Sequence, residues 1–166
     1  MAHENRYTWY VPMMIISFLL QMHAAALIAS APPAPQASPC NVSLWKRVYN
    51  PTRLTQVKSC IVATGVIEES NVDPDGDQHF LMKLDKSESG LLNKRNMKKK
   101  KGDLVVEIVC ANPVKLKKVA VTCVGYKNTV MVPSVGSHVR VTGTYVIDGH
   151  NGWAEIHPAS RIEAVK

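Results

Sequence analysis

Two glycine-containing turn pairs near the end of the chain constrain its fold more than any other feature. Residues 148–152 contain an Asp-Gly and an Asn-Gly pair, which supply the positive φ angles that tight hairpin turns need. Strand-like runs flank the turn. In the second run Trp153, Glu155 and His157 alternate with aliphatic residues, so the three share one strand face. The sequence therefore predicts a closing β-hairpin with one polar face and one apolar face.

The rest of the chain also favours strands. We expect strands over residues 60–69, 79–85, 104–110, 138–147 and 153–162. Gly65 and Gly143 lie inside two of them, where glycine often marks a bend or bulge that a small barrel needs. We therefore predict an all-β fold, a small five-stranded OB-like barrel.

Two segments outside these strands are also expected to be ordered. Residues 44–49 can form a short N-terminal helix or an extended segment, which Pro51 ends. Residues 112–123 are expected to form an inserted hairpin near the third strand.

The N-terminal residues predict export. A short polar start, an apolar stretch and a small-residue tract make residues 1–31 a secretory signal peptide. The alternative is an uncleaved anchor over residues 10–31, which would tether the protein to the membrane. Residues 32–39 are a Pro-rich spacer, and residues 40–166 form the barrel domain. A secreted or cell-envelope location follows, with no dedicated membrane partner.

The cysteines suit an oxidising compartment. Four of them follow the leader, and an even number in an exported chain indicates two disulfides. Three connectivities are possible. The reach of a disulfide disfavours a bond between opposite sheet ends, so we expect Cys40 to pair with Cys60, and Cys110 with Cys123. Asn41 begins a glycosylation sequon, which matters only in a host that glycosylates secreted proteins.

Carboxylates and imidazoles recur two residues apart, which places each pair on one strand face. Asp77 and His79 form one such pair at the start of the second strand. Glu155 and His157 repeat the spacing in the last strand, and Glu107 points the same way in the strand between. These five residues can serve as metal ligands or as an acid–base pair. They can equally be cross-strand polar pairs on a solvated face.

The chain is basic, with a formal net charge of +7. Much of that charge is concentrated in one expected loop, which contains Lys94, Arg95, Lys98, Lys99, Lys100 and Lys101. Such a run attracts phosphate or sulfate groups, or simply forms a solvated loop. Trp153 is either a stacking platform beside these cations or a ring packed against its hairpin.

The chain resembles a family of small exported, mostly bacterial proteins of unassigned function. The shared segments are Asp-Gly-Asp-x-His at residues 75–79, Leu-Leu-Asn at residues 91–93, a strand ending in Cys at residues 102–110, and Gly-Trp-x-Glu-Ile-His-Pro at residues 152–158. The similarity covers most of the chain from about Trp45 onward, and Asn151 stands where the family tends to have a histidine. It implies an OB-like fold and export, and no particular reaction.

These observations predict an exported, disulfide-stabilised binding module. The expected ligand is a polyanion, either single-stranded nucleic acid or acidic polysaccharide. Its candidate ligand-binding residues are Trp153, Glu155, His157, His79, Glu107 and Asp77. One alternative is a metal-dependent enzyme that uses Asp77, His79, Glu107, Glu155 and His157, and another is a structural envelope protein without a ligand. No nucleophile motif or phosphate-binding glycine loop is present, so we predict no catalytic residue and no organic cofactor.

Overall fold

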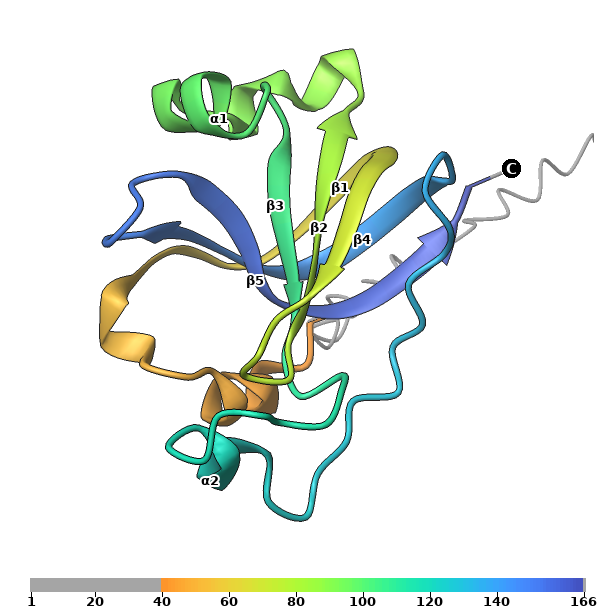
Figure 1. Cartoon of the computed structure of the whole chain (residues 1–166). Helices are drawn as coiled ribbons and strands as arrows, with labels where there is room; N and C mark the ends of the chain where they lie inside the picture. The colour runs from red at the N-terminus through yellow and green to blue at the C-terminus, as the bar shows by residue number, and fades with distance from the viewer. Residues whose placement is uncertain (1–39, 166) are drawn as a thin grey trace, which may run out of the picture. The chain divides into compact units, whose positions relative to one another are not determined.

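Five strands close on one another around a single core. The computed structural model describes residues 40–165, so the expected signal peptide and the whole Pro-rich spacer lie outside the described residues. The strands are β1 (Leu54–Val72), β2 (Gln78–Leu84), β3 (Leu104–Ile108), β4 (His138–Asp148) and β5 (Ala154–Ala164). They join in the order β1-β2-β3-β5-β4, and β4 pairs again with β1 to close the sheet (Figure 1). All pairings are antiparallel except that of β3 with β5.

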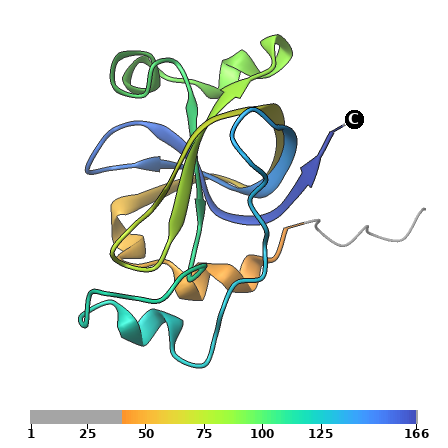
Figure 2. The same cartoon turned by 45° about the vertical axis from the view of Figure 1, so that its right-hand side comes forward.

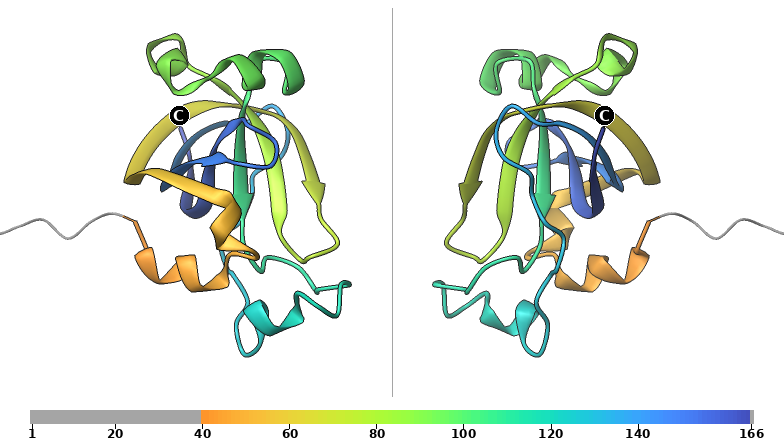
Figure 3. Two further views of the ribbon diagram at one scale, coloured as in Figure 1. Left: turned by 90° about the vertical axis from the view of Figure 1, so that its left-hand side faces the viewer. Right: turned by 90° about the vertical axis from the view of Figure 1, so that its right-hand side faces the viewer.

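Short helical segments lie around the closed sheet. They are η1 (Val42–Arg47), η2 (Pro51–Arg53), η3 (Lys86–Leu91), α1 (Lys94–Lys99) and α2 (Ala120–Cys123). Figures 1 and 2 show α1 at one end of the sheet and α2 at the other, and the side views of Figure 3 agree. None of the helices within residues 40–165 has the length and apolar character that a bilayer crossing requires.

The interior of the sheet is filled by one face of each strand. In β3, Leu104, Val106 and Ile108 point inward and are fully buried, because alternate residues of a strand face opposite sides. Ile156 of β5 is fully buried in the same cluster. The alternation predicted for these two strands is confirmed on the inward side.

A second apolar cluster lies outside the closed sheet. Val109 and Val146 are fully buried although they belong to the outward-facing set. Leu44, Val48 and Leu54 of the N-terminal segment pack on them. The N-terminal segment therefore forms a second layer over part of the outer face, which the sequence did not predict.

Each disulfide fixes one covering segment. Cys40 is bonded to Cys60 and ties the N-terminal segment to β1. Cys110 is bonded to Cys123 and closes the loop that contains α2. Both bonds match the expected local pairing, and they suit an oxidising environment. Arg47 joins the two segments, since its Nη1 donates to the carbonyl oxygen of Thr122 at 3.0 Å.

The sequence predicted a bend or bulge at two glycines, and the structure shows a bulge at one of them, Gly143. Gly65 pairs with Leu84 of β2 on one side and with Val139 of β4 on the other, so β1 is hydrogen-bonded to both neighbouring strands at this residue. The register between β4 and β5 shifts on either side of Gly143, which marks a bulge. Such a bulge helps a sheet to curve round and close.

Two local predictions are wrong. Residues 112–123 do not form a hairpin; within the described chain they form a loop and the short helix α2. Turn bonds such as the one from the Val119 amide to the Leu116 carbonyl satisfy this backbone, and no neighbouring strand edge pairs with it. The basic run is a helix rather than a loop, because Asn93 caps it by accepting hydrogen bonds from the amides of Arg95 and Asn96.

Candidate functional site

The outer face of β2, β3 and β5 gathers most of the predicted polar residues. Glu107 lies at the centre of this face and pairs across the sheet with His79 of β2. On its other side β5 runs parallel to β3, in a register that sets Glu155 opposite Val105. His157 follows Glu155 on the same face of β5. The arrangement of β3 between β2 and β5 matches the expected topology.

Much of this face is buried instead of solvated, which corrects one of the two interpretations of the carboxylate–imidazole pairs. Glu155 is fully buried and His157 is 1% exposed, while Asp77 is 4% exposed. The reason is the layer formed by the N-terminal segment and by the loops after β1 and β3. A large ligand therefore cannot contact Glu155 or His157 directly, although both were candidate binding residues.

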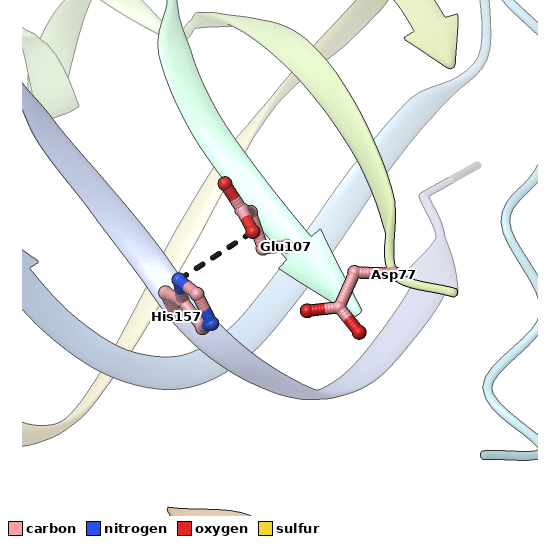
Figure 4. Close-up of side chains that lie close together, drawn as sticks. All are labelled: Asp77, Glu107 and His157. Carbon is pink, nitrogen blue, oxygen red and sulfur yellow. Dashed lines mark ion pairs between the residues drawn. The ribbon is translucent and has the colours of Figure 1, made fainter. Parts of the chain in front are cut away.

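Three side chains form a connected chain of hydrogen bonds beneath this cover. The indole Nε1 of Trp153 donates to Oε2 of Glu155 at 3.0 Å. The other oxygen of Glu155, Oε1, lies 3.1 Å from Nδ1 of His157. Oε2 of Glu107 lies 3.5 Å from the same nitrogen, and this ion pair is drawn in Figure 4. Glu155 thus contacts both the indole and the imidazole from a fully buried position.

Asp77 completes the cluster from the start of β2. One of its oxygens accepts a hydrogen bond from the Cys110 amide at 2.7 Å, so the end of β3 holds it in place. Ligand atoms of Asp77, Glu107 and His157 all lie within 4.8 Å of one another (Figure 4). Two carboxylates and one imidazole are donors that divalent metal ions accept, so these three are the residues that could hold a metal.

Burial and mutual charge shift the pKa values in this cluster. Burial raises the pKa of Asp77 to about 7, although the Cys110 amide opposes that shift. Burial also raises the pKa of Glu107. Burial alone would lower the pKa of His157, but the surrounding carboxylates outweigh it and raise the value to about 9. The cluster therefore holds protons more tightly than the same groups would in water.

A pocket of about 260 Å³ opens above Glu107. Its lining residues are Arg53, Asp73, Pro74, Asp75, His79, Lys100, Val105, Glu107, Leu116, Asn151 and Trp153. At its rim, Nδ1 of His79 lies 2.6 Å from Oδ2 of Asp73. Lys100 places its ammonium 4.0 Å from the centre of the Trp153 ring, a cation–π contact. The pocket therefore combines an indole, cations and carboxylates.

Helix α1 is fixed next to this pocket by a buried asparagine. Nδ2 of Asn96 donates to the carbonyl oxygens of Asp103 and Ala154, and its Oδ1 accepts from the Ala154 amide. These bonds attach α1 to the first residue of β5, directly after Trp153. The basic residues Lys94, Arg95, Lys98 and Lys99 remain exposed on this helix. Lys101 follows it and pairs with Glu69 at 3.4 Å.

The candidate residues chosen from the sequence leave out three charged residues of the pocket lining, Arg53, Asp73 and Asp75. Arg53 comes from η2, and no local pattern indicated that this segment reaches the sheet. Asp73 belongs to the acidic turn just before β2. Its position six residues ahead of His79 could have indicated that the two side chains meet across this turn. The predicted glycosylation residue Asn41 is exposed and lies away from the pocket lining, where it caps η1 by accepting from the Ser43 amide.

Comparison with known proteins adds no assignment to this geometry. No protein-family model matches the chain, and no curated protein matches it.

Proposed function

We propose that the protein is an exported, OB-like module that binds an acidic polysaccharide on the outer face of β2 and β3. The strand order, with β3 parallel to β5, fits the five-stranded OB arrangement. OB-folds bind oligosaccharides and oligonucleotides on the face of strands 2 and 3, between the loop that joins strands 1 and 2 and the loop that joins strands 4 and 5.

The observation that carries this proposal is the origin of the pocket lining. Asp73 and Asp75 come from the loop between β1 and β2, and His79 and Glu107 come from β2 and β3. Asn151 and Trp153 come from the loop between β4 and β5. The pocket thus occupies the position at which this kind of fold holds its ligands.

The chemistry of the lining favours a sugar unit over a nucleotide. Carboxylates accept hydrogen bonds from hydroxyl groups, and Asp73, Asp75 and Glu107 are all positioned to do so. The same carboxylates repel any anionic group that enters the pocket, so the ligand must present hydroxyl groups there and keep its charged groups outside. The indole of Trp153 offers an apolar surface for one ring face, once the flexible Lys100 side chain moves aside.

The basic helix explains why the polysaccharide should be acidic. Lys94, Arg95, Lys98 and Lys99 are exposed on α1, which adjoins the pocket through Lys100. A cluster of like charge raises the local concentration of an oppositely charged polymer. One sugar unit would enter the pocket while neighbouring carboxylate or sulfate groups lie along α1.

Titration with polygalacturonate, heparin and a single-stranded DNA oligomer tests the proposal. Polysaccharide binding should weaken steeply as salt rises, and replacing Lys98, Lys99 and Lys100 by Gln should reduce that dependence. The matched control replaces Lys46, Lys58 and Lys127, which lie neither on α1 nor in the pocket lining, and should leave it unchanged. Trp153→Phe should alter the fluorescence response to the polysaccharide, whereas Trp45→Phe should preserve it.

Two results would contradict the proposal. The first is polysaccharide binding that ignores both the α1 lysines and Trp153. The second is tighter binding of the DNA oligomer than of either polysaccharide, which would make single-stranded nucleic acid the ligand.

A further inference from the structure

One buried nitrogen in the cluster lacks a hydrogen-bond partner. Nε2 of His157 is inaccessible to water and makes no hydrogen bond, and the residue is 1% exposed. Buried polar atoms almost always have a partner, so such an atom needs an explanation. Among residues 40–165 the other two unpartnered buried side-chain atoms are Nε of Arg53 and Nδ2 of Asn112. Those two can only donate a proton, whereas an imidazole nitrogen can offer a lone pair to a metal ion.

Two carboxylates lie around this imidazole. Figure 4 shows the ring of His157 with Glu107 on its Nδ1 side and Asp77 across from its other nitrogen. One oxygen of each acid and one ring nitrogen of His157 lie within 4.8 Å of one another. Donors about 2.1 Å from a common ion are at most about 4.2 Å apart, so small side-chain rotations would bring these atoms into range.

The second nitrogen of the His157 ring, Nδ1, already has the kind of partner that metal-binding histidines have. Nδ1 of His157 faces Glu155 at 3.1 Å, and Glu155 is itself held by Trp153. A histidine that binds metal through one nitrogen generally donates the proton on the other to a carboxylate or carbonyl oxygen. With Nδ1 donating to Glu155, Nε2 is the nitrogen left for a metal ion, which would bind there by displacing the second ring proton. The orienting interaction is therefore already in place.

The charges and the access path also suit a cation. Asp77, Glu107 and Glu155 place three carboxylates around one imidazole in a buried site. A divalent cation would offset that excess of negative charge. Glu107 also lines the pocket, so an ion that enters the pocket from solvent reaches one of the three proposed ligands directly.

From these observations we propose that Asp77, Glu107 and His157 bind a divalent transition-metal ion, Zn²⁺ or one of similar chemistry. His157 supplies Nε2 and each acid supplies one oxygen. Glu155 is a positioning residue that acts through His157. Nitrogen and oxygen donors of this kind suit zinc, cobalt and manganese. This proposal does not depend on polysaccharide binding.

Titration of the chelator-treated protein with CoCl₂ and with ZnCl₂ tests the site. We expect one equivalent of Co²⁺ to give a visible absorption spectrum that Zn²⁺ abolishes by competition. Glu107→Gln and Asp77→Asn should each weaken binding at least about 100-fold, because each removes a ligand. Glu155→Gln should weaken binding about 10- to 100-fold and change the cobalt spectrum without abolishing it.

His138→Gln is the matched control, because His138 also pairs with a carboxylate, that of Asp85 at 3.0 Å, but lies outside the cluster. It should bind metal as the unmodified protein does. Circular dichroism establishes that each variant is folded, and both Glu107→Gln and Asp77→Asn keep the size of the original side chain. Absence of stoichiometric binding, or binding that both of these variants retain, would overturn the proposal. A failure to bind polysaccharide would not affect this result.

Discussion

Glu155 and His157, two residues apart on β5, meet side chain to side chain at 3.1 Å, and both are buried. Each group has a second neighbour, since Glu155 also accepts the Trp153 indole proton and His157 lies near Glu107. A buried charge whose partner is removed is strongly destabilising. The free energy of unfolding should therefore fall when either Glu155 or His157 is replaced by an apolar residue.

Glu155→Leu should lower the free energy of unfolding by about 3–5 kcal/mol, because it leaves the imidazole and the indole N–H without their acceptor. Chemical denaturation at pH 7 measures the change. Glu163→Leu is the control on the same strand, since Glu163 is exposed and should change stability by about 0.5 kcal/mol or less. Equal losses in the two variants would contradict the role of Glu155.

Gly143→Ala should destabilise the closed sheet. A Cβ atom at this position would lie 2.5 Å from Cγ2 of Ile156 and 2.6 Å from the carbonyl oxygen of Pro158. Because these atoms are packed in the core, we expect a loss of about 1–3 kcal/mol, measured by thermal or chemical unfolding. Gly90→Ala, where a Cβ would meet nothing within 4 Å, should be nearly neutral. A neutral Gly143→Ala would show that β4 and β5 can separate at this bulge.

The stability contributed by Asp148 should depend on pH. Burial would raise the pKa of this carboxyl, but hydrogen bonds from Asn151 and His150 and the charge of Arg53 outweigh burial and lower it. A lowered pKa in the folded state adds stability above the unfolded value of about 4, and that stability is lost as the pH falls through the folded value. Asp148→Asn should therefore cost about 1–2 kcal/mol at pH 7, and the cost should shrink below about pH 4.

This dependence is measured by recording denaturation curves of Asp148→Asn and of the unmodified protein at about ten pH values between about pH 2.5 and pH 8. A cost that stays constant across the range would assign the effect to packing instead of charge.

Replacing Cys110 and Cys123 by Ser should free the loop they close. The bond joins residues 13 apart, and a loop of this size contributes about 3 kcal/mol. Hydrogen exchange should quicken in residues 111–127 and remain slow in β1 and β4. The same replacement at Cys40 and Cys60 serves as the comparison, because it should quicken exchange in residues 41–53 instead. Uniform exchange throughout the chain would mean that neither segment moves separately.

The inward half of the fold was predictable because it depends on local alternation. Leu104, Val106 and Ile108 alternate with the outward residues of β3, and that pattern alone places them in the core. The five strands and the local disulfide pairing follow from equally short-range signals. The ends of the strands were less well predicted, and β1 extends from Leu54 to Val72, well beyond the expected residues 60–69.

The outward half was not predictable because its burial depends on distant contacts. Val109 and Val146 are covered by Leu44 and Val48, and no local pattern states that this segment folds back over the sheet. One signal was present, since Val109 is an apolar residue on the face expected to be solvated. Local alternation was enough to place the five polar candidates on one face of the sheet. The burial of His157 depends on distant contacts and was not predicted.

Helix α1 shows a local signal that the charge of its residues obscured. Asn93 caps the helix, and Asn96 completes a reciprocal capping box. Asparagine before a run of lysines is compatible with a helix start, but the charges suggested a solvated loop. Whether this helix attracts a polyanion stays a prediction, as does the resemblance to exported bacterial proteins.

The parallel contact between β3 and β5 has a mechanical consequence. Its paired residues are Val105 with Glu155 and Val106 with Ile156, and the next outward side chains along the two strands are Glu107 and His157. Beyond these two residue pairs, the contact between the strands includes the ion pair of Glu107 with His157. The attraction along this part of the seam therefore depends on the charge of two side chains.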